Sequence, residues 1–504
     1  MGRSARERFG GGQIPKNSKP VFCQKTGFEF LGVFAARAHL GAYAERNLNM
    51  DWTRKFHEPF VCAALLFALT AGFGYGAYLV VARALDLRLG AWFANGRLVG
   101  ALSQAHGHAQ LFGWVGLLVL GMGLVFFPKL RGTNLKGITR APFALGLLAA
   151  GIVVRSIVQP LAGFWGTNEI LRALFLLSAI LELVGIVLVV AMYLETVRAA
   201  KPLAPESPAF PVELFIQIIF ISFSLACLIN LLGAWNVFSQ GKIILAPRYE
   251  QLIINLMVYG VALPTAFVFS IRALPLFLRL EIPARGVWQS LAFYYFVGLT
   301  LRVLPNFLAI VDDAVILTGR VLRANFLLVL LLDALAVMGA LLMSVCILIG
   351  VWQLKLWRRR GALPDQSAFG RFDLLIYSAY LWLVSATIFD VLRVLPFVNE
   401  RIDIPQDAAR HALLVGFITL FLFGIAVRML PGFSGTRGVA FPRLVIWIFA
   451  LGNLAALLRV APLFFAETEW ATWALAASGI AGWGAVVGVA IVLGRTFQKR
   501  EILN

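Results

Sequence analysis

The chain has 504 residues and a formal net charge of +19, and 60% of its residues are hydrophobic while only 14% are charged. Soluble globular proteins average roughly 45–50% apolar and about 25% charged residues. The composition therefore excludes a soluble multidomain enzyme, a disordered chain and a disulfide scaffold. It predicts a polytopic membrane protein whose basic residues lie in loops facing the cytoplasm, with no nucleic-acid partner.

The first 49 residues differ from the rest of the chain. They are polar, contain eight Lys and Arg residues, and have none of the apolar stretch that a secretory signal requires. Two interpretations stay open: a basic cytoplasmic tail, or a stretch upstream of the true start at Met50. Residues 50–504 are predicted to form a single transmembrane domain.

Twelve apolar runs follow, each of about 20 residues or more, the length that crosses a ~30 Å hydrocarbon core. They are continuous and rich in Leu, Val and Ala, and the alternating ten-residue strands of a membrane barrel do not occur. We therefore predict an all-α membrane helix bundle in a lipid bilayer. The predicted segments are 59–84, 104–127, 141–161, 170–195, 213–238, 249–278, 286–308, 324–353, 373–397, 407–431, 443–465 and 468–494.

Loop charge predicts the orientation of the bundle. Three basic groups lie on the side of the membrane where the first segment begins: Lys129, Arg131, Lys136 and Arg140; Lys355, Arg358, Arg359 and Arg360; and Arg495, Lys499 and Arg500. The positive-inside rule then places both termini in the cytoplasm. The membrane is expected to be the inner membrane of a bacterium. Even-numbered segments would start, and odd-numbered segments would end, on the outer side.

Three of the five histidines fall within the predicted membrane segments. His106 and His108 open the second segment and His411 opens the tenth, so all three lie at a similar depth on the outer side. Ionisable residues at membrane depth are costly and are functional candidates. Neutral imidazole ligates iron, copper and zinc, and two imidazoles on different helices can hold a haem between them. The alternative is a histidine that only makes a hydrogen bond to a neighbouring helix.

Helical geometry separates the two neighbouring histidines. Residues i and i+2 of a regular helix point about 200° apart. His106 and His108 therefore serve different sites, unless the turn at Gly107 is irregular. One is predicted to approach His411 between segments two and ten, while the other faces a further interior site.

A short Arg-x-x-Pro element ends several segments, because proline cannot continue a helix. It begins at Arg272, Arg302, Arg393, Arg428 and Arg459. The predicted topology places Arg302, Arg393 and Arg459 on the outer side, against the usual charge bias, so we predict that they bind haem propionates or an anionic substrate. The alternative is that they pair with Asp390 or Glu400. Glu182, in the middle of segment four, is interpreted as a hydrogen-bonded group that locks helices together.

Three blocks of sequence resemble the NnrS family and occur in the family's order. They are His106-Gly107-His108-Ala109-Gln110-Leu111-Phe112-Gly113, Ser270-Ile271-Arg272-Ala273-Leu274-Pro275-Leu276-Phe277 and Arg410-His411-Ala412-Leu413-Leu414-Val415-Gly416-Phe417. The resemblance implies a haem protein of nitric oxide metabolism or the nitrosative stress response, found with denitrification. Copper, nitric oxide or another small diatomic ligand, an electron donor and an oxidoreductase activity are further implications. Ala109 stands where the family often has Glu, and Tyr377 where it has a further His, so an altered copper site is expected.

A weaker likeness connects the chain to the catalytic subunit of haem-copper oxidases and nitric oxide reductases. That subunit needs about six histidines, and this chain has three at membrane depth, which disfavours a full oxidase core. A secondary transporter, with Pro264 breaking a helix, and a non-catalytic membrane sensor or assembly factor are the alternative functions. The predicted cofactor site comprises the possible metal ligands His106, His108 and His411, with Arg302, Arg393 and Arg459 beside them.

Overall fold

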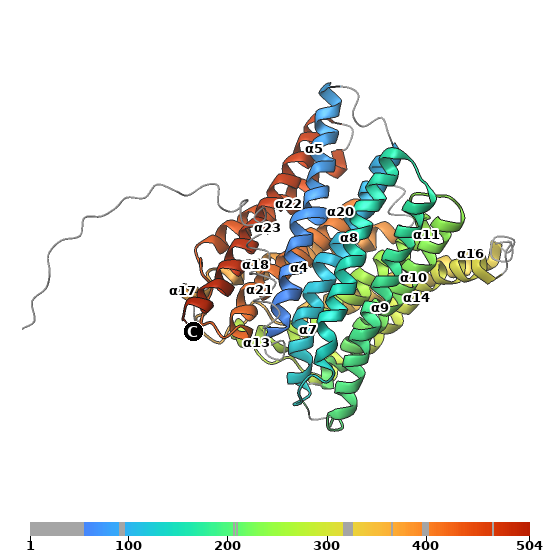
Figure 1. The fold of residues 1–504 in the computed structure, drawn as a ribbon. Helices are drawn as coiled ribbons and strands as arrows, with labels where there is room; N and C mark the ends of the chain where they lie inside the picture. Colours follow the sequence, from blue (N-terminus) through green and yellow to red (C-terminus); the bar gives the residue numbers. More distant parts are fainter. Residues whose placement is uncertain are drawn as a thin grey trace, which may run out of the picture. The chain divides into compact units, whose positions relative to one another are not determined.

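The computed structural model describes residues 55–89, 96–204, 207, 210–315, 326–363, 366–395, 403–465 and 468–503. Residues 52–504 form one compact unit. Within the described part of the chain, twelve helices are long and apolar enough to cross a membrane, which confirms the predicted all-α bundle (Figure 1). The N-terminal stretch 1–49 and its alternative start lie outside the described residues.

We number the twelve membrane spans in chain order. Spans 1 to 3 are α4 (His57–Phe67), η1 (Ala68–Gly72) and α5 (Phe73–Leu89); α6 (Gly96–His108), η2 (Ala109–Gly116) and α7 (Leu117–Leu130); and η3 (Ile138–Arg140) with α8 (Ala141–Trp165). Spans 4 to 6 are α9 (Glu169–Ala199); α10 (Phe210–Ser239); and α11 (Pro247–Asn255), η4 (Leu256–Ala262) and α12 (Leu263–Arg272).

The second half follows the same pattern. Spans 7 to 9 are α14 (Arg285–Val315), α16 (Phe326–Gln353) and α18 (Phe372–Val394), and the short helices α13 (Leu274–Phe277) and α17 (Gln366–Phe369) lie in the connections. Spans 10 to 12 are α20 (Gln406–His411), η5 (Ala412–Thr419) and α21 (Leu420–Phe433); α22 (Leu444–Val460) and η6 (Ala461–Phe465); and α23 (Glu469–Leu503).

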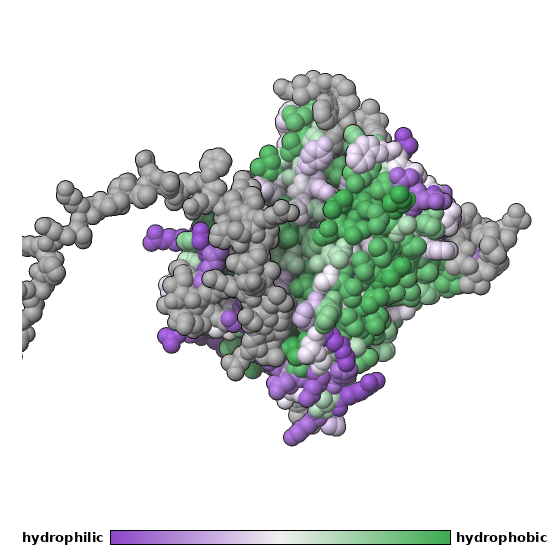
Figure 2. Space-filling view, in the orientation of Figure 1, coloured by the Kyte–Doolittle hydropathy of each residue, from purple (hydrophilic) through white to green (hydrophobic). Residues whose placement is uncertain are grey.

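The spans differ in how far they are buried inside the bundle. Spans 2, 6 and 10 are the most completely buried, whereas spans 7 and 8 turn most of their side chains outward. Figure 2 shows a broad hydrophobic face with hydrophilic side chains gathered toward its ends. This is the surface expected where a helix bundle meets lipid, because apolar side chains cover backbone groups that are already bonded within each helix.

Four of the described spans contain a π-helical stretch. The stretches η1, η2, η4 and η5 are π-helical, with η2 beginning directly after His108 and η5 directly after His411. Such π-helical turns are rare and frequently occur at functional sites. Spans 1, 2, 6 and 10, which carry them, all contribute side chains to the cavity described below.

The second span begins earlier than hydropathy predicts. The helix starts at Gly96 rather than near residue 104, because residues 96–103 continue it although Arg97 and Ser103 are polar. At 1.5 Å per residue, His106 therefore lies about 15 Å along the helix instead of in its first turn.

Candidate functional site

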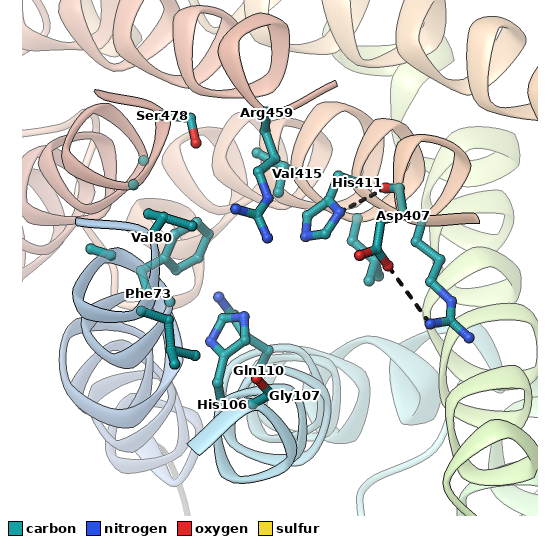
Figure 3. A pocket seen from close by; sticks show the side chains of 18 of the residues that line it. Phe73, Val80, His106, Gly107, Gln110, Asp407, His411, Val415, Arg459 and Ser478 are labelled. Atoms are coloured by element: carbon teal, nitrogen blue, oxygen red, sulfur yellow. Dashed lines mark hydrogen bonds and ion pairs between the residues drawn. The ribbon is translucent and has the colours of Figure 1, made fainter. Parts of the chain in front are cut away.

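A cavity of about 450 Å³ lies among six of the spans (Figure 3). Its walls come from α5, from α6 with η2, from α11, from α20 with η5, and from α22 and α23. Apolar side chains such as Phe73, Val80 and Trp114 cover much of the wall. His106 and His411 face each other across it. The volume lies within the range of roughly 300–1,000 Å³ that is usual for cofactor and ligand pockets.

His106 is held by span 1 rather than by its own helix. Its Nδ1 lies 2.8 Å from the carbonyl oxygen of Gly72. Because a carbonyl only accepts hydrogen bonds, Nδ1 carries the proton and Nε2 keeps its lone pair. Gly76, one turn further along span 1, makes room for the ring: a Cβ there would lie 2.7 Å from Cε1 of His106.

His411 repeats this arrangement on the opposite wall. Its Nδ1 lies 2.7 Å from the carbonyl oxygen of Asp407, one turn earlier in α20 (Figure 3). Nδ1 is again the donor, so Nε2 carries the lone pair. A histidine that ligates a metal almost always donates its other ring N–H in this way, which fixes the tautomer and the orientation of the ring. Both rings are thus prepared as neutral nitrogen donors.

Spans 2 and 10, which the sequence predicts to be neighbours, meet through side chains. The rings of Trp114 on η2 and Phe423 on α21 pack with centroids 5.7 Å apart. His106 and His411 line the same cavity from these two spans. The structure therefore brings together two of the three histidines that the sequence singled out.

Only one of the three predicted arginines reaches these histidines. Arg459 on α22 lines the cavity and extends toward the space between the two imidazole rings (Figure 3). Arg302 binds both carboxylate oxygens of Asp390, at 2.5 and 3.1 Å, and Arg393 binds one of them at 3.1 Å. Arg302 and Arg393 thus make the alternative pairing with Asp390. Glu400 lies outside the described residues.

His108 points away from the cavity. Its Nε2 lies 2.8 Å from Oε1 of Glu182 on α9, and its ring stacks on Phe112 with centroids 4.3 Å apart. The second oxygen of Glu182 accepts a hydrogen bond of 2.9 Å from Nδ2 of Asn230 on α10. This confirms the interpretation of Glu182 as a paired carboxyl. His108, two residues after His106, thus faces the opposite side of the helix.

The hydrogen bonds continue from Asn230 back to the cavity. Arg155 on α8 donates to Oδ1 of Asn230 and, at 3.3 Å, to Oε1 of Gln159. Gln159 donates to Gln104 at 2.9 Å, and Gln104 donates to Glu250 at 2.9 Å. Glu250 lines the cavity. The set His108, Glu182, Asn230, Arg155, Gln159, Gln104 and Glu250 is called the polar network below.

A three-ligand metal site does not form around these groups. Among the described residues, no cluster of three or more His, Cys, Asp or Glu side chains could hold a metal ion. Tyr377 takes no part in either site, since its hydroxyl accepts a hydrogen bond of 2.8 Å from Arg359. The metal donors that face the cavity are the two imidazoles of His106 and His411.

Several residues that line the cavity or hold its histidines were not predicted from the sequence. Gly72 and Gly76 lie in a glycine-rich stretch that looks like any membrane helix, and Asp407 contributes only its backbone oxygen to His411. Arg83, Arg410 and Gln110 also line the cavity. Arg410 and Gln110 stand within the family-like blocks, which was the one available signal.

A comparison with protein-family models matches the NnrS protein family over residues 54–498. No curated protein matches the chain. The family match includes all twelve spans, both cavity histidines and the polar network. Because it covers most of the chain, the protein belongs to the NnrS family.

Proposed function

We propose that the protein is an integral membrane haem protein of the nitric oxide response, with His106 and His411 as the axial ligands. One observation carries the proposal: two imidazoles on facing helices each donate Nδ1–H to a backbone carbonyl and turn toward one cavity. Neutral imidazoles fixed in this tautomer are the usual axial ligands of low-spin haem.

The remaining wall suits the same cofactor. Arg459 extends toward the space between the two rings, and Arg83 and Arg410 line the same cavity. Guanidinium groups bind carboxylates bidentately, which suits propionates. Phe73 and Trp114 would exclude water from the macrocycle. A bound haem would supply iron that exchanges electrons with a donor protein, and nitric oxide or another small diatomic ligand would bind the iron by displacing one of the two imidazoles.

Copper, the possible second cofactor, has less support. It would need further ligands beside His108, and that side chain is bonded to Glu182 in a group with no third metal donor among the described residues. We therefore assign His108 to the polar network, as a group that joins helices. Copper binding stays a prediction of the family resemblance.

The test compares visible spectra of the purified protein and its histidine variants. We expect a low-spin haem spectrum that is lost in His106→Gly and in His411→Gly but kept in His108→Ala. Added imidazole should restore the spectrum in the two glycine variants, because it can occupy the vacated position. Such rescue separates the loss of a ligand from the loss of the fold.

The control is His57→Ala, which changes a histidine at the opposite end of span 1. It should leave the spectrum unchanged. A wild-type protein without haem, or haem retained in both glycine variants without imidazole, would contradict the proposal. The secondary transporter would then be the stronger interpretation. A nitric oxide consumption assay on the haem-loaded protein separates turnover from sensing or an assembly role.

A further inference from the structure

A second and much smaller cavity, of about 20 Å³, lies beside the first. Its walls come from span 6, from α14, from the end of α18 and from span 10. Three guanidinium groups line it, those of Arg302, Arg393 and Arg410, together with one carboxylate, that of Asp390. We call it the arginine cavity. Arg410 also lines the larger cavity.

The single carboxylate is shared between two of the arginines. Arg302 uses both terminal nitrogens on Asp390, and Nη2 of Arg302 also lies 3.2 Å from the hydroxyl of Tyr259. Arg393 donates a hydrogen bond to Asp390 through its Nη2 alone. The Nε of Arg393 is buried, and no hydrogen-bond partner reaches it within the described part of the chain. One N–H donor at this cavity, the Nε–H of Arg393, therefore has no acceptor among the described residues.

The positive charge of the third arginine, Arg410, is also only partly neutralised. Arg410 donates to the neutral side chain of Gln251 at 2.6 Å, and its nearest carboxylate, on Asp407, is 3.9 Å away. Asp407 is largely exposed, so solvent screens this pair. Three positive charges therefore surround the cavity, and Asp390 is the one carboxylate among its described lining residues. Glu250, which lines the larger cavity, offsets part of the charge of Arg410.

Uncompensated positive charge in a membrane helix bundle is costly, and a bound anion removes that cost. We propose that the arginine cavity binds a small monovalent inorganic anion, of the size of a halide or nitrite, beside Arg393 and Arg410. The size limit follows from the small volume of about 20 Å³, since one water molecule already needs ~10–15 Å³ of space occupied by a water-sized probe. Sulfate and organic carboxylates are too large. The proposal does not rest on haem in the larger cavity.

The test follows the thermal unfolding of the full-length protein in detergent at constant ionic strength. Sodium gluconate is replaced stepwise by sodium bromide, by sodium nitrite or by sodium sulfate. A ligand that binds only the folded protein raises the midpoint of unfolding in a concentration-dependent way. We expect bromide and nitrite to raise it with saturation, and sulfate to behave like gluconate.

Two variants should change the response in opposite directions. Arg393→Gln removes the incompletely paired charge and should raise the half-saturating bromide concentration by about tenfold or more. Asp390→Asn removes the competing carboxylate and should lower that concentration. Arg140→Gln, which alters a half-exposed arginine paired with Glu195, is the matched control and should respond like the wild type.

A further variant separates this site from the proposed haem. His411→Gly should keep the bromide response, although it should lose the haem spectrum. Bromide located by anomalous scattering between Arg393 and Arg410 would support the proposal directly. Equal responses to bromide and gluconate, or an unchanged half-saturating concentration in Arg393→Gln, would overturn it whatever the haem content.

Discussion

The position of the His106 ring depends on a missing side chain. Gly76 leaves the space that the ring occupies, and a Cβ there would lie 2.7 Å from its Cε1. We predict that Gly76→Ala turns the ring away and breaks its bond to Gly72. If His106 is an axial ligand, haem affinity should fall by roughly 10–100-fold, as it does when the group orienting a metal ligand is lost.

The measurement is a haem titration followed by the visible spectrum. Gly123→Ala on α7 is the matched control, because a Cβ there would meet no atom within 4 Å. Both variants should unfold at similar temperatures, since the imidazole ring can rotate to relieve the clash. Wild-type haem affinity in Gly76→Ala would show that the orientation of His106 is unimportant for the cofactor.

For single residues, the sequence predicted the direction in which a side chain points but not the group that it contacts. The helical phase correctly predicted that His106 and His108 point to different sites. Which of them meets His411 depends on the Gly72 carbonyl of span 1 and the Glu182 carboxylate of span 4, and helical phase does not predict those contacts. Likewise, the same Arg-x-x-Pro pattern leads Arg459 to the histidines and Arg302 to Asp390.

The elements are joined inside the bundle by the polar network. It connects α6, α8, α9, α10 and α11, and Asn230 is its central link, accepting from Arg155 and donating to Glu182. We predict that Asn230→Leu destabilises the protein by about 1–3 kcal/mol, because the buried side chains of Arg155 and Glu182 then each lose a hydrogen-bond partner. Thermal or denaturant unfolding in detergent measures the effect.

Asn236→Leu, further along the same helix, is the control for this change and should leave the free energy of unfolding nearly unaltered. The haem spectrum should survive in both variants, because neither touches the larger cavity. A stability equal to the wild type in Asn230→Leu would mean that solvent or a rearranged side chain replaces the bond.

The elements themselves follow from hydropathy, and all twelve predicted segments overlap a span. The irregular, π-helical parts of these elements do not follow from hydropathy. The π-helical stretches η2 and η5 begin after His108 and His411, yet sequences such as Leu413-Leu414-Val415 favour an ordinary membrane helix. A π-helical turn is selected by packing and by side-chain bonds across helices, which a single-helix pattern does not contain.

For the whole molecule, twelve crossings return the chain to the side where it began. The loop after span 2 carries Lys129, Arg131, Lys136 and Arg140, whereas the turn after span 3 consists of Gly166, Thr167 and Asn168. Basic loops are retained in the cytoplasm, so this asymmetry fixes the expected orientation. The cavity histidines would then lie toward the outer half of the membrane.

Single cysteines in a cysteine-free background test that orientation. We predict that Thr167→Cys reacts with a membrane-impermeant maleimide added to intact spheroplasts, because Thr167 is exposed and its turn is expected to lie on the outer side. Asn134→Cys, equally exposed in the basic loop, should react only after the membrane is opened. Both variants react alike in detergent, which controls for local reactivity. The reverse pattern would place both termini outside and move the two cavity histidines to the cytoplasmic half, where a cytoplasmic electron donor could reach them directly.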